Sequence, residues 1–341
     1  MAVKTLAIKY RPATWEDVVE QSSTKVILQQ QLQSGEVKNA YLFCGPAGCG
    51  KTTCARIFAN DINHGLGNPI ELDAASNNGV DDVRNIIQQA KTKSLDSEYK
   101  IFIIDECHAL SNSAWQAMLK IIEEPPAKSI FIFATTDPQK IPRTILSRVQ
   151  RYDFSRISQE GIVSRLWSIC HAEGRNINKV LGDALEYIAK IADGGMRDAI
   201  SLMDKCLAFS PDLTLENVVS ALGTVDYQTM LQLSSDILTK NTKAVIYIVE
   251  ALHATGKDIK QFVKQYLQFL LDVQKYGVGC DWKYLQIPKL AECEEWLEDL
   301  KPSDYAVLGD LLDDIIKLNS DIKWSSTAKY DLEAVLFRSC V

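Results

Sequence analysis

One glycine-rich segment constrains the fold of this chain more than any other feature: Gly45-Pro-Ala-Gly-Cys-Gly-Lys51-Thr52. It matches the pattern G-x-x-x-x-G-K-[ST], follows an apolar run at Ala40 to Cys44 that predicts a strand, and precedes a helix predicted to begin at Lys51. In that setting backbone N–H groups surround a phosphate chain, and the helix N-terminus adds partial positive charge. We therefore predict a phosphate loop for ATP or GTP, in which Lys51 holds the β- and γ-phosphates and Thr52 holds Mg²⁺. The nucleotide-binding residues expected from this loop are Gly45, Pro46, Ala47, Gly48, Cys49, Gly50, Lys51, Thr52 and Thr53.

A second motif, Ile101-Phe-Ile-Ile-Asp105-Glu106-Cys-His108, is an apolar strand that ends in two adjacent carboxylates. This arrangement is typical of the Walker B element. We expect Asp105 to bind Mg²⁺ through its waters, and Glu106 to orient and polarise the attacking water as a catalytic residue. A strand that merely ends in solvated acids is the alternative. His108 is open to a structural, a coupling or a catalytic role.

The segments around these motifs alternate between strand and helix patterns. Pro69 to Ala75 and Ser129 to Thr135 read as strands, whereas Gly79 to Lys93 and Ser113 to Glu124 read as helices. This alternation predicts an α/β fold, with a parallel sheet covered by helices on both faces. Ligands of such sheets bind beyond the carboxyl ends of the strands, so we expect Thr136 to sense the γ-phosphate or the attacking water.

Length and composition bound the remaining possibilities. A chain of 341 residues suits two or three domains, and its net charge of −7 argues against a broadly basic surface for nucleic acid. Any DNA contact must then be local. The nine cysteines include no Cys-x-x-Cys pair, which favours reduced thiols, although Cys44, Cys49 and Cys54 are close enough in sequence to be weighed as metal ligands. No stretch has the length of a membrane helix or a signal core, so we expect a cytoplasmic protein without membrane contact.

Several further blocks resemble the AAA+ clamp-loader ATPase family, in particular its bacterial DNA polymerase III gamma/tau branch. They occur in the family's order through most of the first 223 residues. The blocks are Lys9-Tyr-Arg-Pro12 with Trp15-Glu-Asp-Val-Val19, Glu71-Leu-Asp-Ala-Ala-Ser76, Glu123-Glu-Pro-Pro126, Ala134-Thr-Thr-Asp-Pro-Gln-Lys140, Ile145-Leu-Ser-Arg148 and Gly194-Gly-Met-Arg-Asp-Ala199.

The resemblance implies roles for particular residues. Thr136 would be sensor 1, and Arg197 would be sensor 2, contacting the phosphates of its own subunit's nucleotide from a small helical domain. Arg148 would be an arginine finger that enters the neighbouring subunit's site. The residues around adenine would be Tyr10, Arg11, Pro12 and Val19.

The resemblance also implies an architecture and partners. An AAA+ ATP-binding core would span residues 1–157, a helical lid with sensor 2 residues 158–224, and an all-helical collar for oligomerisation residues 225–341. ATP binding would open a sliding clamp and grip primer-template DNA, and hydrolysis would release both, within a ring of subunits expected to be pentameric. A hexameric branch-migration or translocase ATPase and a catalytically silent scaffold subunit are the alternatives.

Three departures from the family pattern qualify these expectations. Residues 60–68 are short and free of cysteine where bacterial members usually insert a four-cysteine zinc module, so we predict no zinc. Glu20 stands where glycine is usual, and Val149 stands where cysteine is usual. The chain ends at Val341, as expected of the short form of the family.

The last third carries no catalytic pattern, and helical periods recur in it. We predict helices at Tyr227 to Thr239, Thr242 to Thr255, Ile259 to Tyr276 and Ser303 to Asn319. The acidic segment from Glu292 to Asp314 is interpreted as a solvated helix face, with a docking surface as the alternative.

Overall fold

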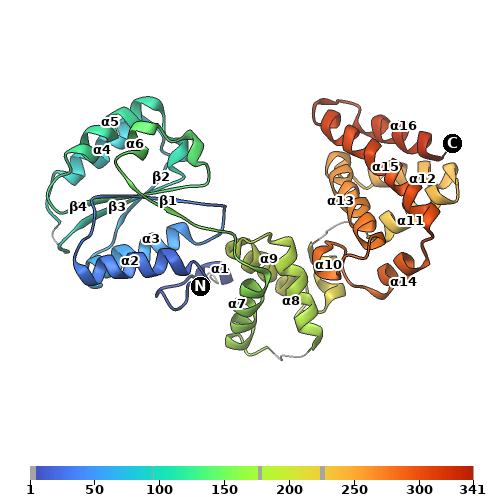
Figure 1. Cartoon of the computed structure of the whole chain (residues 1–341), viewed down its shortest axis with the longest axis horizontal. Helices are drawn as coiled ribbons and strands as arrows, with labels where there is room; N and C mark the ends of the chain where they lie inside the picture. Colours follow the sequence, from blue (N-terminus) through green and yellow to red (C-terminus); the bar gives the residue numbers. More distant parts are fainter. Residues whose placement is uncertain (1–4, 95, 176–178, 223–226, 341) are drawn as a thin grey trace. The chain divides into compact units, whose positions relative to one another are not determined.

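The computed structural model of the chain describes residues 5–94, 96–175, 179–222 and 227–340 (Figure 1). The chain divides into two compact units. The first comprises Met1–Asn178 and Ile188–Asp204, and the second comprises Lys179–Tyr187 and Lys205–Val341. Within the described residues, no helix combines the length and the apolar character that crossing a membrane requires.

The first unit is built on a parallel sheet of five strands in the order β2-β3-β4-β1-β5. Each of the four predicted strands is confirmed. The order places the carboxyl ends of β3 and β1 on either side of β4, so Asp105, Cys44 and Thr135 end neighbouring strands. The strands are β1 (Ala40–Cys44), β2 (Ile70–Asp73), β3 (Lys100–Asp105), β4 (Ser129–Thr135) and β5 (Gln150–Asp153).

Helices cover both faces of this sheet, as the α/β prediction requires (Figure 1). In β4, Ile130 and Ile132 pack into the same core as Phe58, whereas Phe131 and Phe133 pack on the other face with Trp115. Every residue of β1 and β4 is buried, which is typical of a parallel strand covered on both sides. One face carries α2 (Ser22–Ser34) and α3 (Lys51–Ile62), and the other carries α4 (Val80–Ala90), α5 (Asn112–Glu123) and α6 (Arg143–Leu146).

Four more helices belong to the N-terminal segment and to the predicted lid. They are α1 (Leu6–Lys9), α7 (Gln159–Ala172), α8 (Lys179–Ile191) and α9 (Met196–Phe209). α7 and the first turns of α9 lie in the first unit. The predicted border between residues 157 and 158 stays a prediction, and the one between residues 224 and 225 lies outside the described residues.

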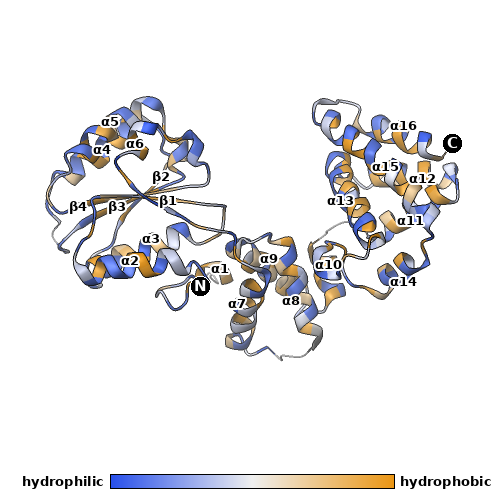
Figure 2. Ribbon diagram, viewed as in Figure 1, coloured by the Kyte–Doolittle hydropathy of each residue, from blue (hydrophilic) through white to orange (hydrophobic). Residues whose placement is uncertain are grey.

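The described part of the second unit is helical. The four helices predicted from periodicity are confirmed as α11, α12, α13 and α15, and their apolar faces enclose one core that includes Tyr266 and Phe269. Figure 2 shows hydrophilic and hydrophobic residues alternating along these helices, as in amphipathic helices. The helices are α10 (Leu215–Leu222), α11 (Tyr227–Leu238), α12 (Thr242–Ala254), α13 (Ile259–Gly277), α14 (Ala291–Asp299), α15 (Pro302–Asp321) and α16 (Ala328–Cys340).

A buried carboxylate fastens part of this helical core. Asp272 of α13 has no exposed surface and accepts hydrogen bonds from the backbone N–H groups of Gln286, at 2.5 Å, and Ile287, at 3.2 Å. The Lys275 ammonium lies 3.0 Å from the same carboxylate. Because a buried charge is tolerated only when it is paired, these contacts hold residues 285–287 against α13.

Candidate nucleotide site

A cavity of about 900 Å³ opens at the carboxyl edge of the sheet in the first unit. It is large enough for a nucleotide, since ligand pockets commonly measure about 300 to 1,000 Å³. Of the predicted nucleotide-binding, metal-binding and catalytic residues, those that line it are Tyr10, Arg11, Pro12, Val19, Ala47, Gly48, Cys49, Gly50, Lys51, Thr52, Thr53, Asp105, Glu106 and Arg197. Gly45 and Pro46 are not part of the lining, and their carbonyls accept hydrogen bonds from Lys51.

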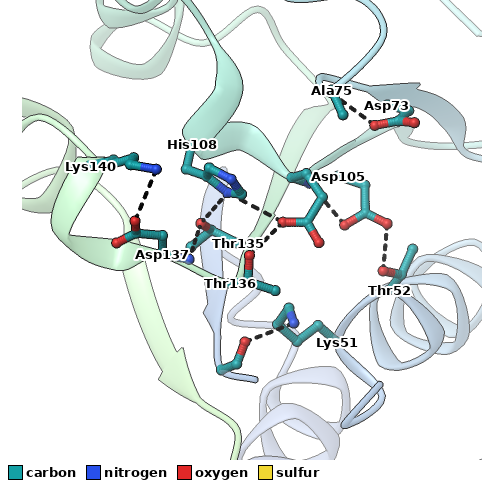
Figure 3. Close-up of polar contacts among 12 residues, drawn as sticks. Lys51, Thr52, Asp73, Ala75, Asp105, His108, Thr135, Thr136, Asp137 and Lys140 are labelled. Atoms are coloured by element: carbon teal, nitrogen blue, oxygen red, sulfur yellow. Dashed lines mark hydrogen bonds and ion pairs between the residues drawn. The ribbon is translucent and has the colours of Figure 1, made fainter. Parts of the chain in front are cut away.

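The phosphate loop is held in place by the strands on both sides of β1. The Gly45 N–H donates to the Thr135 carbonyl at 3.2 Å, and a Cβ on Gly45 would lie only 2.4 Å from the Phe154 carbonyl oxygen. Lys51 is 5% exposed, and its Nζ donates to the carbonyls of Gly45 at 2.8 Å and Pro46 at 2.7 Å. Figure 3 shows the Lys51 side chain folded toward the loop. The cation is thus positioned where the loop would wrap a phosphate.

A hydroxyl and a carboxylate lie close together where the phosphate loop and the Walker B motif adjoin. The Thr52 hydroxyl, on the first turn of α3, donates to Asp105 Oδ2 at 2.7 Å (Figure 3). The other oxygen of Asp105 accepts from the Glu106 N–H at 3.0 Å. A hydroxyl and a carboxylate are the kind of ligand that Mg²⁺ takes, since it binds through one or two oxygens and keeps several waters. The residues present therefore fit the predicted magnesium ion.

The second carboxylate is bound by a residue that directly follows β4 and by one on the turn after β3. Glu106 has a left-handed backbone with φ 45°, and its Oε2 accepts from the Thr136 hydroxyl at 2.9 Å. His108 Nδ1 lies 3.3 Å from the same oxygen and 3.2 Å from Thr135 Oγ1. Thr136 is thus brought to the site through Glu106, although it does not line the cavity. The contact of His108 with Glu106, two residues away on the same turn, was not predicted, and its contact with Thr135 depends on the strand order.

The predicted base end of the cavity is formed by the N-terminal segment. Arg11 Nε donates to Thr53 Oγ1 at 3.3 Å, and burial, followed by the nearby charge of Arg56, lowers the pKa of the Arg11 guanidinium. Around Tyr10, Pro12 and Val19 the cavity is also lined by apolar side chains that were not predicted, namely Ala7, Ile8, Val18, Ile157 and Ile200. No motif marks these side chains, since ordinary apolar residues occur throughout the chain.

Further polar residues that were not predicted also line the cavity. Arg56 of α3 lies 2.5 Å from Glu71 of β2, and both side chains are partly exposed. Asp73, at the end of β2, and Asp198, on the first turn of α9, are the other acids. Arg56 lies on the helix predicted to begin at Lys51, and Glu71 and Asp73 lie in the strand predicted from Pro69 to Ala75, but the convergence of these side chains was not predicted.

The predicted sensor 2 arginine and the predicted arginine finger lie in different surroundings. Arg197 lines the cavity from the first turn of α9, which is attached to the phosphate loop because the Met196 N–H donates to the Gly48 carbonyl at 3.0 Å. Arg148 is not part of the lining. Its guanidinium pairs with Glu123 at 2.7 Å, donates to the Thr144 carbonyl, and is 39% exposed.

Comparison with known proteins assigns the chain to a family. Three family models match successive parts of it from residue 68 onward: DNA polymerase III, delta subunit, over residues 68–158; DNA polymerase III clamp loader subunit, ATPase lid domain, over residues 161–212; and DNA polymerase III subunits gamma and tau domain III, over residues 213–341. The DNA polymerase III subunit tau of Bacillus subtilis is 35% identical over a 363-residue alignment that covers the whole of this chain. The chain belongs to the AAA+ clamp-loader ATPase family.

Other members of the clamp-loader family are similarly related. The gamma/tau subunit of Mycobacterium tuberculosis is 35% identical over 78% of this chain, and the tau subunit of Escherichia coli is 33% identical over 79%. This clamp-loader chain spans 64% of the length of the Bacillus relative, 50% of the Mycobacterium relative and 45% of the Escherichia relative.

Solved structures agree on the fold of the clamp-loader chain. The RuvB Holliday junction branch migration motor of Thermotoga maritima aligns with a TM-score of 0.53 and 18% identity, over 73% of this chain and 86% of that one. At that identity the likeness concerns the AAA+ fold alone. The predicted fold class, an AAA+ parallel-sheet domain followed by helical domains, is confirmed.

The sequence also predicts that the chain binds no zinc. Among the residues described, no three His, Cys, Asp or Glu side chains gather as a metal site would require. Cys44, Cys49 and Cys54 are all buried in the sheet core or the loop beside it. The absence of zinc stays a prediction.

Proposed function

We propose that this chain is an ATP-hydrolysing motor subunit of a DNA polymerase sliding-clamp loader. ATP binding would organise a ring of subunits, expected to be pentameric, that opens the clamp and grips primer-template DNA, and hydrolysis would release the clamp on DNA. The observation that carries the proposal is the set of residues around the cavity: Lys51, Thr52, Asp105 and Glu106 converge at one end, and Arg197 enters from the predicted lid.

The proposed roles follow from where the side chains lie. Lys51 and the loop N–H groups would hold the phosphate chain of ATP, and Thr52 with Asp105 would hold Mg²⁺, which supplies neutralisation of phosphate charge when bound. Glu106 would orient the attacking water and accept its proton. Thr136, which now holds Glu106 Oε2, would present that carboxylate or sense the γ-phosphate.

Arg197 is proposed to couple nucleotide binding to movement of the lid. Its helix begins at the phosphate loop, since the Met196 N–H is bound to Gly48. A nucleotide whose phosphates engage both the loop and Arg197 would therefore bias the arrangement of the two elements, as in other domain-closing ATPases.

Arg148 is proposed to serve a neighbouring subunit. It does not line its own cavity, and its partner Glu123 ends α5 at a half-exposed site. A guanidinium at such a site could turn toward a neighbour's phosphates without disturbing its own phosphate loop. Fingers of this kind are worth about 10³ to 10⁵ in rate.

Two inactive variants test the proposal together. Arg148→Ala should retain ATP binding, because its own cavity is unchanged, and Lys51→Ala should lose it. When both variants are mixed under conditions where subunits exchange, some interfaces combine an intact loop with an intact finger, and ATPase activity should partly return. Full activity of Arg148→Ala alone, or no recovery in verified mixed rings, would refute the finger. Unchanged ATP affinity of Lys51→Ala would refute the nucleotide site.

A hexameric DNA branch-migration or translocase ATPase is the second candidate, because a motor of that kind shares the AAA+ fold. The two candidates differ in what they do to DNA. A clamp loader should hydrolyse ATP faster when both a clamp and primed DNA are present, whereas a branch-migration motor should move a four-way junction with no clamp. Measuring both activities in the purified assembly decides between them.

A further inference from the structure

The N-terminal strap, residues 5–21, carries the predicted base-facing residues, and it is bound along one side of α7. The contacts on α7 come from Ser158, Gly161, Arg165 and Glu173, which we call the strap face. Their spacings of three, four and eight residues place them on a single helical face. All of these residues belong to the first unit.

Arg165 occupies the middle of the strap face and joins two parts of the strap. Its Nη2 donates to the Tyr10 carbonyl at 3.1 Å, and its Nη1 lies 3.4 Å from Asp17 Oδ1. The side chain is 17% exposed. A partly buried guanidinium with two partners on one segment sets the position of that segment, because both bonds must be kept together.

Gly161 lets the strap approach the helix closely. A Cβ at this position would lie 2.6 Å from Glu20 Oε1 and 3.1 Å from Val19 Cγ1. Glu20 in turn accepts from the Ser158 N–H at 3.2 Å and from its hydroxyl at 2.5 Å. The residue that departs from the usual family glycine thus fastens the strap to the start of α7, beside the cavity-lining Val19.

The other end of α7 holds the aromatic residue of the strap. The Tyr10 hydroxyl donates to Glu173 Oε1 at 2.5 Å, and the Lys9 ammonium lies 2.6 Å from the same oxygen. Hydrogen bonds from Lys9 and then Tyr10 lower the pKa of Glu173, so this carboxylate is ionised at neutral pH. The middle and the far end of α7 therefore both contact Tyr10, through its carbonyl and through its hydroxyl.

α7 is also tied to the helix that carries Arg197. The Ile157 N–H, just before α7, donates to the Gly194 carbonyl at 3.1 Å, and the Arg156 guanidinium pairs with Asp193. The Leu6 N–H of the strap donates to Asp204 of α9 at 3.1 Å. The strap, α7 and the start of α9 are therefore one connected set of contacts around the cavity.

We propose that Arg165 is a positioning residue for the base end of the nucleotide: through the Tyr10 carbonyl and Asp17 it sets the strap that contacts adenine. The inference rests on the proposed ATP site. It assigns recognition of the nucleoside to a strap held by α7, and recognition of the phosphates to the loop held by the sheet. Arg165 itself is not part of the cavity lining.

The test separates the nucleoside from the phosphates. Calorimetry would measure the binding of ATP and of inorganic tripolyphosphate, which lacks a base, to the unaltered chain and to Arg165→Ala. We expect ATP affinity to fall about tenfold, the size of a lost charge-assisted hydrogen bond, and tripolyphosphate affinity to stay within about twofold. Arg165→Lys, which keeps the charge near Asp17 with a less suitable geometry, should recover part of the ATP affinity. Arg84→Ala, which removes an exposed arginine paired with Asp81 on α4, is the matched control and should change neither affinity.

A second variant can be measured if Arg165→Ala does not fold well. Tyr10→Phe removes only the hydroxyl that donates to Glu173, and it should lower ATP affinity about threefold with no effect on tripolyphosphate. Unchanged ATP affinity in both variants, or equal losses for ATP and tripolyphosphate, would overturn the positioning role. If the unaltered chain binds ATP no more tightly than tripolyphosphate, the positioning role of Arg165 is refuted, whereas the phosphate site is not. Failure of the unaltered chain to bind either ligand would refute the proposed function and this inference with it.

Discussion

Replacing Gly45 by alanine should damage both the sheet and the phosphate loop. The added Cβ would lie 2.4 Å from the Phe154 carbonyl oxygen and 2.9 Å from Phe154 Cβ, closer than real Cβ contacts. Phe154 cannot simply retreat, because it is buried, packs on Phe43 with ring centroids 5.3 Å apart, and donates its N–H to the Cys44 carbonyl at 2.7 Å. The methyl group must therefore separate the ends of β1 and β5.

The size of the effect follows from these contacts. Forcing a methyl group into packed surroundings costs about 1 to 3 kcal/mol, and weakening the Phe154–Cys44 hydrogen bond costs about 1 kcal/mol more, so we expect a loss of about 3 kcal/mol. Gly35→Ala is the matched control. Gly35 also has a positive φ, 71°, but nothing lies within 4 Å of its added Cβ, so only backbone strain of about 1 kcal/mol applies.

Hydrogen exchange measured by mass spectrometry reports this difference locally. Peptides covering β1 should exchange roughly a hundredfold faster in Gly45→Ala, and no more than about tenfold faster in Gly35→Ala, since about 1.4 kcal/mol corresponds to a factor of ten. ATP affinity should also fall at least about tenfold in Gly45→Ala, because the displaced carbonyl is a partner of Lys51. Equal protection of β1 in the two variants would refute the steric argument.

Three further predictions address the water-activating carboxylate, the thiols and the second unit. Glu106→Gln should keep ATP binding and lower the hydrolysis rate at least about a hundredfold, because the charge that would activate water is lost while the contact with Thr136 can be kept; near-normal turnover would place the catalytic carboxylate elsewhere. Burial raises the pKa of Cys54 to about 12 and that of Cys44 to about 11, so both thiols stay protonated at pH 8. A thiol reagent should therefore modify the partly exposed Cys280 quickly in the folded chain, and all nine cysteines only after denaturation. Rapid modification of Cys44 or Cys54 in the folded chain would contradict this. Asp272→Ala should destabilise the second unit by about 3 kcal/mol, because it leaves the N–H groups of Gln286 and Ile287 without their acceptor. Hydrogen exchange in α13 measures this loss. The control Asp313→Ala, at an exposed position, should cost less than about 0.5 kcal/mol.

Local patterns in the sequence were enough to determine the elements that carry the site. The glycine and lysine spacing of the phosphate loop, the apolar run before it and the helix that begins at Lys51 are features of adjacent residues, and all of them were predicted. The same holds for β3, whose run of apolar residues ends in Asp105 and Glu106. Periodicity likewise predicted α11, α12, α13 and α15, because each has a continuous buried face.

Elements with few buried residues were not predicted. β5 has one buried side chain, Tyr152, so neither alternation nor an apolar run marks it as a strand. α14 buries only Cys293 and Leu297 among many acids, so the acidic segment was interpreted as a solvated helix face but the bounds of this helix were not predicted. Pattern reasoning depends on repeated burial, and edge elements supply too little of it.

Contacts between distant residues were decided by the tertiary structure alone. The strand order places β4 beside β3, and only then can Thr136 reach Glu106 and Thr135 reach His108. Tyr10 and Glu173, 163 positions apart, share a hydrogen bond because α7 lies along the strap. Spacing along the chain reports which residues share an element, whereas the packing of elements depends on the whole core. The sequence therefore determined the chemistry of the nucleotide site, and the fold decided which side chains would position it.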